Sequence, residues 1–151
     1  MTYKKDREIK IGNTLIGDYH EPKFISEIGV NHLGNFDRMK NMIRLSYEAG
    51  ADFLKFQTYK AETRYDLKSN PKAKEFIKLT SSWELSEEEN IESWRYAKSL
   101  GANVFTSVYD EGEIKFSMDM GTTAFKIAAF EIVNLKLVHA VAETKLPIIA
   151  S

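Results

Sequence analysis

Apolar residues recur along the chain in five short runs, each of which ends in a polar or charged group. Short apolar runs between turn residues predict buried strands, and apolar residues at helical spacing separate these runs. The alternation predicts an α/β fold with a parallel sheet. The predicted strands cover about residues 24–31, 52–58, 103–108, 124–129 and 147–151.

The segments between these strands carry local helix signals. Ser86-Glu87-Glu88-Glu89 is a capping box that predicts the start of a helix. Gly50 suits the C-terminal end of the preceding predicted helix, which begins near Asn35. The predicted helices cover about residues 35–50, 86–101, 111–119 and 134–143.

Two segments depart from the alternation. The dipeptide Gly12-Asn13 lies between two alternating runs and predicts a tight hairpin, so residues 1–22 are expected to form a plug separate from residues 23–151. Residues 60–85 are charged and irregular, with a short helix expected near 71–79. This excursion is interpreted as a solvated surface or as a lid.

Lys55 and Lys126 occupy matching places, because each lies five residues after a glycine that closes a helix. Alternate strands of an eight-stranded barrel fill one interior layer, so the two amines are expected to converge at the carboxyl ends of the strands. A buried ammonium attracts phosphate or carboxylate, or forms a Schiff base if its pKa falls. Alternatively, each lysine faces outward and pairs with a carboxylate.

Glu27 is expected to share a strand face with Gly29 and Asn31. Two lysines beside it would keep it ionised, ready to accept hydrogen bonds from a hydroxyl-rich substrate or to move a proton. A structural ion pair is the alternative.

Four further polar residues follow or end predicted strands. Gln57 shares the face of Lys55 and adds an amide, whereas Ser107 and Ser151 could help to bind phosphate. Glu131 directly follows the fourth strand of the parallel series, where it faces the same mouth or favours the start of the next helix.

Composition narrows the class of protein. A chain of 151 residues predicts one domain with a real core, and a net charge of −1 gives no electrostatic case for binding nucleic acid. No apolar run has membrane-spanning length or resembles a signal peptide. The absence of cysteine excludes disulfides and suits the cytoplasm. His20, His32 and His139 lack metal-ligand spacing, so no metal site is expected from this chain alone.

Residues 26–32 (Ser-Glu-Ile-Gly-Val-Asn-His) and 50–58 (Gly-Ala-Asp-Phe-Leu-Lys-Phe-Gln-Thr) resemble motifs of the sialic acid synthase family, whose members make N-acetylneuraminate, legionaminate or pseudaminate. Residues 125–132 and 146–151 match later family motifs in order. The resemblance covers about residues 8–151. It implies a (β/α)8 TIM barrel that condenses phosphoenolpyruvate with an N-acetylmannosamine-type sugar and releases phosphate.

The resemblance also implies roles for particular residues. Phosphoenolpyruvate would be held by Lys55, Ser107, Lys126 and Ser151. The sugar would be met by Glu27, Gln57 and Glu131. Ala129 stands where the family usually has serine, which removes one phosphate donor.

The family's divalent metal, Mn²⁺ or Mg²⁺, is held by histidines from later strands, and its full-length members are implied to be homodimers. About five strands of the barrel are expected here, so the chain is interpreted as the N-terminal portion of a synthase with little activity alone.

Two other functions remain open at this stage. One is a class I aldolase-like barrel in which Lys55 or Lys126 forms an imine. The other is a non-catalytic half-barrel that binds phosphorylated ligands or a partner chain.

Overall fold

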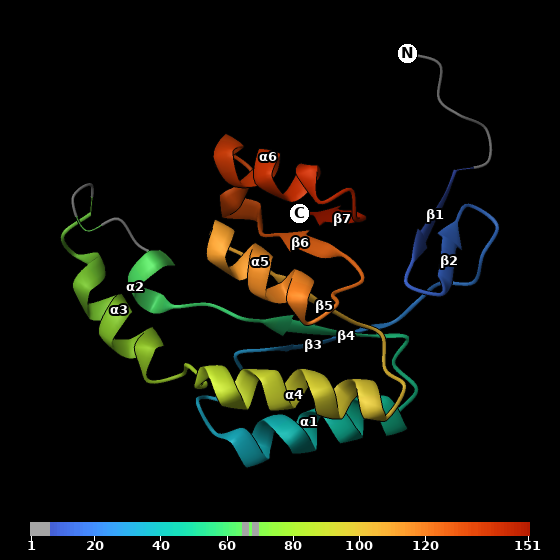
Figure 1. Cartoon of the computed structure of the whole chain (residues 1–151), viewed down its shortest axis with the longest axis horizontal. Coiled ribbons are helices and arrows are strands. Elements are labelled where there is room, and N and C mark those ends of the chain that lie inside the picture. Colours follow the sequence, from blue (N-terminus) through green and yellow to red (C-terminus); the bar gives the residue numbers. More distant parts are fainter. Residues whose placement is uncertain (1–6, 65–66, 68–69) are drawn as a thin grey trace.

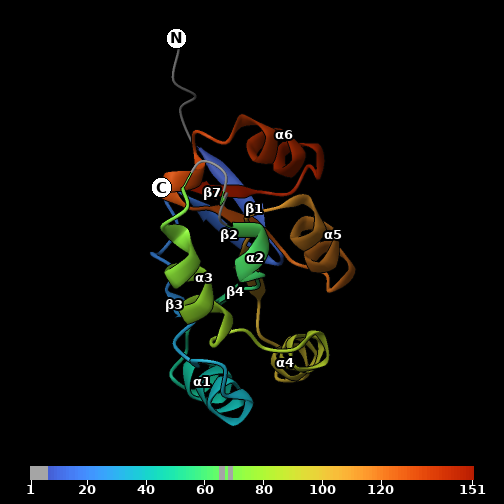
Figure 2. The same cartoon turned by 90° about the vertical axis from the view of Figure 1, so that its left-hand side faces the viewer.

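The computed structural model describes residues 7–64, 67 and 70–151. In this part of the chain, five parallel strands form one sheet in sequence order, as the alternation of elements predicts. Four helices form an arc along one side of the sheet (Figure 2). The strands are β3 (Ile25–Gly29), β4 (Phe53–Gln57), β5 (Val104–Ser107), β6 (Phe125–Ile127) and β7 (Ile148–Ala150). The helices of the arc are α1 (Phe36–Glu48), α4 (Glu87–Ser99), α5 (Glu111–Asp119) and α6 (Leu135–Glu143).

The core lies mainly between the sheet and these helices. Leu54 and Phe56 of β4 are buried against α1 and α4, where Phe56 meets Trp94 edge to face at 5.4 Å between ring centroids. Phe125 and Ile127 of β6 pack in the same way against α5 and α6. Because side chains alternate along a strand, the residues between these apolar ones project from the opposite, concave side of the sheet.

An antiparallel hairpin covers the amino ends of the strands, at the right in Figure 1. It consists of β1 (Glu8–Ile11) and β2 (Thr14–Gly17), joined through Gly12 with a φ of 58°. Ile11 is 3% exposed and packs with Phe53 and Phe105 on the concave side. The predicted hairpin is therefore confirmed.

The excursion after β4 lies at the carboxyl ends of the strands, away from the hairpin (Figure 1). It contains α2 (Ala61–Arg64) and α3 (Ala73–Ser81), so the expected short helix is present. The Tyr59 hydroxyl donates to the Thr80 carbonyl at 2.7 Å, and the Ala61 amide donates to Glu84 Oε1 at 2.7 Å. Part of the excursion, residues 65, 66, 68 and 69, lies outside the described residues.

Two strands end earlier than their apolar patterns predict: β6 ends at Ile127, before a 3-10 turn that begins at Ala129, and β3 ends at a bulge. β3 ends at Gly29, where a β-bulge shifts the register with β4 and Gly29 adopts a φ of 52°. The backbone N–H of Asn31 then donates to the Ile28 carbonyl at 3.1 Å, and the chain turns. The expectation that Asn31 shares a strand face with Glu27 is therefore wrong, because the alternation of side chains stops at the bulge.

A 3-10 turn, η1 (Ala129–Glu131), connects β6 to α6. Among the described residues, no helix combines the length and the apolar character that crossing a membrane requires.

Candidate active site

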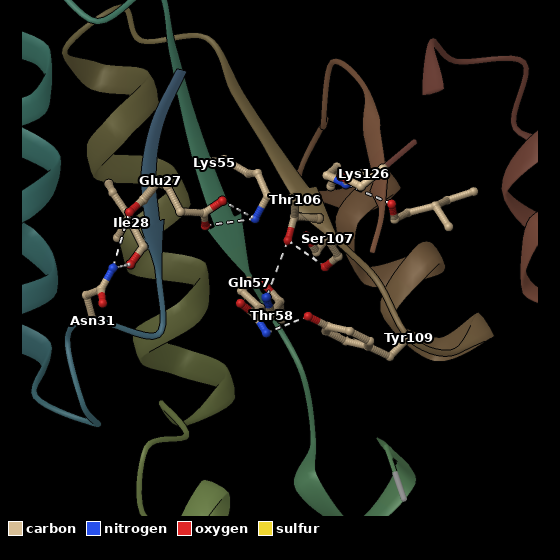
Figure 3. Close-up of polar contacts among 12 residues, drawn as sticks. Glu27, Ile28, Asn31, Lys55, Gln57, Thr58, Thr106, Ser107, Tyr109 and Lys126 are labelled. Carbon is tan, nitrogen blue, oxygen red and sulfur yellow. Dashed lines mark hydrogen bonds and ion pairs between the residues drawn. The ribbon is translucent and has the colours of Figure 1, made fainter. Parts of the chain in front are cut away.

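Glu27 and Lys55 form an ion pair on the concave side of the sheet. They are register partners on the neighbouring parallel strands β3 and β4. Lys55 Nζ lies 2.8 Å from each of the two Glu27 carboxylate oxygens (Figure 3). The Lys55 side chain is 9% exposed and that of Glu27 56%, so the buried ammonium lies beneath an accessible carboxylate.

Lys126 adds a second amine to the same side. Its Nζ donates to the Ile127 carbonyl at 2.8 Å and to the Ser151 hydroxyl. Burial lowers the pKa of Lys126, the positive charge of Lys55 lowers it further, and the carboxylate of Glu27 opposes both effects. Lys126 lies between Phe125 and Ile127, which pack against the helices, so its side chain projects from the side of the sheet that carries Lys55 and Glu27.

A row of polar side chains runs across the three central strands. Gln57 is the register partner of Ser107, and Ser107 is the register partner of Lys126. Ser107 is 3% exposed. The Gln57 amide nitrogen donates to the Tyr109 hydroxyl (Figure 3). One side of the sheet therefore presents two amines, a carboxylate, an amide and hydroxyl groups near the ends of its strands.

Two of the expected site residues serve local structure. The side-chain Nδ2 of Asn31 donates to the carbonyls of Ile28 at 3.0 Å and Glu27 at 3.3 Å, so this side chain is held at the end of β3. Glu131 Oε2 accepts from Asn134 Nδ2 at 3.0 Å, and Asn134 caps α6. A role for either residue in binding substrate stays a prediction.

The comparisons with known proteins decide the family. The model described as NeuB family matches residues 42–151. The chain belongs to the NeuB family. It is 34% identical to the N,N'-diacetyllegionaminic acid synthase of Legionella pneumophila, over an alignment that covers 84% of this chain and 38% of that protein.

Solved structures of similar proteins agree with this membership. The sialic acid synthetase of Leptospira borgpetersenii, solved with citrate, has a TM-score of 0.85 and 26% identity, over 96% of this chain and 49% of that one. The spore coat polysaccharide biosynthesis protein SpsE of Bacillus subtilis has a TM-score of 0.78 and 31% identity, over 95% and 39%. The five strands are thus part of a (β/α)8 barrel. The chain spans 38% to 43% of the length of the curated relatives that it matches.

In this NeuB-family chain, an aromatic cluster that the sequence pattern does not predict lies beside the polar row. The Tyr109 ring stacks on Phe130 with 6.0 Å between centroids and 8° between planes. The Arg64 guanidinium carbon lies 4.4 Å from the centroid of the Tyr109 ring. Burial raises the pKa of the Tyr109 phenol to about 12, so the hydroxyl stays protonated. The position of Tyr109 just after a strand could have indicated a site residue. Nothing in the sequence of the charged excursion sets Arg64 apart from its other charged residues.

The buried carboxyl group of Glu113 binds the backbone at Tyr109. Glu113 is 6% exposed, and its Oε2 accepts from the amides of Tyr109 at 2.5 Å and Asp110 at 3.3 Å. Burial raises the pKa of Glu113 to about 8, and the charge of Asp110 adds to the rise. The capping box of α5 thereby fixes the backbone that carries Tyr109.

The divalent metal that family resemblance implies finds no ligand set in the part of the chain described by the structure. No group of three or more histidine or acidic residues could hold an ion there.

Proposed function

We propose that the protein condenses phosphoenolpyruvate with N-acetylmannosamine or a related N-acetylated amino sugar, giving a sialic acid-type nonulosonate and phosphate. The observation that supports it is the ion pair of Glu27 with the buried Lys55, on the side of the sheet where Lys126 adds a second amine. Relatives of the chain are synthases of legionaminic and pseudaminic acids and of N-acetylneuraminate 9-phosphate. This chain would contribute the phosphoenolpyruvate half of the site.

The amines account for the first substrate. Phosphoenolpyruvate carries a phosphate and a carboxylate, and charge-assisted hydrogen bonds from fixed donors suit both groups. Lys126, with Ser151 beside it and Ser107 on the neighbouring strand, would bind one anionic group. Lys55, already buried beneath its carboxylate, would bind the other.

Carboxylates account for the course of the reaction. As C3 of phosphoenolpyruvate bonds to the aldehyde carbon of the sugar, positive charge develops at C2 and the aldehyde oxygen takes up a proton. Water then adds to C2 and releases a proton, which balances the one taken up by the aldehyde oxygen, and phosphate leaves as its bond to C2 breaks. The accessible carboxylate of Glu27 would stabilise the charge at C2, while Gln57 and Glu131 would hold sugar hydroxyls.

Binding of phosphoenolpyruvate tests the proposal on the chain as it stands. We expect Lys126→Met and Lys55→Met each to weaken binding about tenfold or more in calorimetric titrations, since each removes a charge-assisted hydrogen bond. Lys136→Met is the matched control, because the Lys136 side chain is 85% exposed on α6. Equal affinity in all three variants would overturn the proposal. Phosphate release with N-acetylmannosamine, assayed on the full-length protein, separates a synthase from a barrel that only binds phosphorylated ligands.

The lowered pKa of Lys126 favours a second candidate, an aldolase-like barrel that forms a Schiff base. A less basic amine is more often neutral and therefore nucleophilic. Borohydride reduction in the presence of pyruvate, followed by mass spectrometry, distinguishes the two. A covalent adduct on Lys126 would support the aldolase, whereas an unmodified chain that binds phosphoenolpyruvate would support the synthase.

A further inference from the structure

An exposed aromatic ring stands beside the polar row. Phe130 is 58% exposed, whereas Tyr109, on which it stacks, is 8% exposed. The stack thus has a buried ring and a ring open to solvent. Such a ring offers its π face to the C–H groups of a ligand, an arrangement common in binding sites for small molecules.

Several contacts hold the stack in place. The edge of Tyr59 meets Tyr109 with 6.5 Å between centroids and 84° between planes. The Arg64 guanidinium carbon lies 5.5 Å from the centroid of Phe130 as well as 4.4 Å from that of Tyr109. Gln57 holds the hydroxyl of Tyr109. A ligand that packs on Phe130 would meet a surface already ordered, which reduces the entropic cost of binding.

The charges around the stack select the kind of ligand. Besides burial, which raises the pKa of the Tyr109 phenol most, charges of both signs act on it: that of Arg64 lowers the pKa, whereas those of Glu113, Glu27 and Glu131 raise it. Because the Arg64 guanidinium and these carboxylates oppose one another, the charges at the stack do not select an anion, whereas the amines that attract one belong to Lys55 and Lys126. Carboxylates and an amide beside an apolar ring instead suit a neutral, hydroxyl-rich molecule that carries an apolar group.

We propose that Phe130, supported by Tyr109, is the platform on which the acetamido methyl group of the amino sugar packs, and that it makes the site prefer N-acetylated sugars over free amino sugars. This inference rests on the proposed function and adds a specificity-determining residue to it. The acetyl methyl is the most apolar group of such a sugar, and in the free amino sugar an ammonium takes its place.

The test compares two sugars and four proteins. N-acetylmannosamine and mannosamine are titrated, with phosphoenolpyruvate and a metal chelator present, into the wild-type chain and into Phe130→Ala, Phe130→Trp and Phe76→Ala. Binding is followed by NMR. Phe76 is the matched control, since it is 59% exposed on α3. Thermal unfolding of each variant verifies that it is folded.

Phe130→Ala is expected to weaken N-acetylmannosamine about five- to tenfold and to leave mannosamine unchanged, because it removes one methyl–aromatic contact. Phe130→Trp and Phe76→Ala are expected to keep the wild-type preference. A wild-type chain that binds neither sugar, or binds both equally, would overturn the platform, as would equal losses for both sugars in Phe130→Ala.

Titration with phosphoenolpyruvate alone separates this inference from the proposed function. If Lys126→Met loses phosphoenolpyruvate while Phe130→Ala keeps its preference between the sugars, only the platform is wrong. If the wild-type chain does not bind phosphoenolpyruvate, both the proposed function and the role of Phe130 as a platform are wrong.

Discussion

At the scale of single residues, the Glu27–Lys55 pair joins side chains of very different exposure, 56% and 9%. Removing the carboxylate leaves a buried ammonium without its partner, whereas removing the ammonium leaves a carboxylate that water can solvate. We therefore expect Glu27→Gln to lower the free energy of unfolding by about 1–2 kcal/mol and Lys55→Met by less than about 1 kcal/mol. Urea denaturation at pH 7 measures both values. A larger loss in Lys55→Met would contradict this account.

The free energy of unfolding is expected to depend on pH because of Glu113. Its pKa rises from an ordinary 4.5 to about 8 in the folded chain, so between these values the folded state holds a proton that the unfolded state has released. The stability that Glu113 contributes is complete below about pH 4.5 and is lost as the pH rises through 8. We expect Glu113→Gln to flatten this decline, which urea denaturation at pH 5, 6.5 and 8 would reveal. Parallel curves for the variant and the wild type would refute the assignment.

At the scale of elements, the bulge at Gly29 makes room for the ion pair. A Cβ at Gly29 would lie 2.8 Å from Glu27 Oε1, in addition to the strain of a positive φ. At Gly50, which has a φ of 83°, a Cβ would meet no atom within 4 Å. We expect Gly50→Ala to cost about 1 kcal/mol and Gly29→Ala about 2–3 kcal/mol.

A second background isolates the contact with Glu27. When Glu27→Ala is also present, the added cost of Gly29→Ala is expected to fall to that of Gly50→Ala, because no carboxylate remains to be displaced. Chemical denaturation of the four variants measures this coupling. An undiminished cost in the Glu27→Ala background would show that backbone strain alone explains Gly29.

Elements whose boundaries depend on local chemistry could be predicted from the sequence. The capping box at Ser86 and Glu89 starts α4 where expected, and Asn35 caps α1. The bulge could not be predicted, because it depends on how β3 pairs with β4 and on the space that Glu27 occupies. That one register shift removes Asn31 from the strand face on which alternation placed it.

At the scale of the whole molecule, one part of the candidate site could be predicted from the sequence and another part could not. The placement of Lys55 and Lys126 on one side of the sheet follows from matched positions in a βα repeat, and such positions are visible in the sequence. The meeting of Arg64, Tyr109 and Phe130 joins an excursion, a strand end and a 3-10 turn. No local sequence pattern encodes a contact between segments so far apart, so this cluster could not be predicted from the sequence.

The sheet of the described residues also has two edges, β3 and β7, each with one hydrogen-bonded neighbour. Beside β3 runs a groove of about 580 Å³ whose walls include Phe24, 73% exposed, and Leu45, 54% exposed. An apolar edge strand with free backbone groups favours pairing with another chain. We therefore expect this chain to self-associate as its concentration rises, in size-exclusion chromatography with light scattering. The double substitution Ile25→Lys with Leu45→Glu should shift it to monomer, whereas Leu79→Glu, at an equally accessible site on α3 (50% exposed), should not. A wild-type chain that stays monomeric at every concentration, or a control that dissociates it equally well, would show that this edge does not drive association.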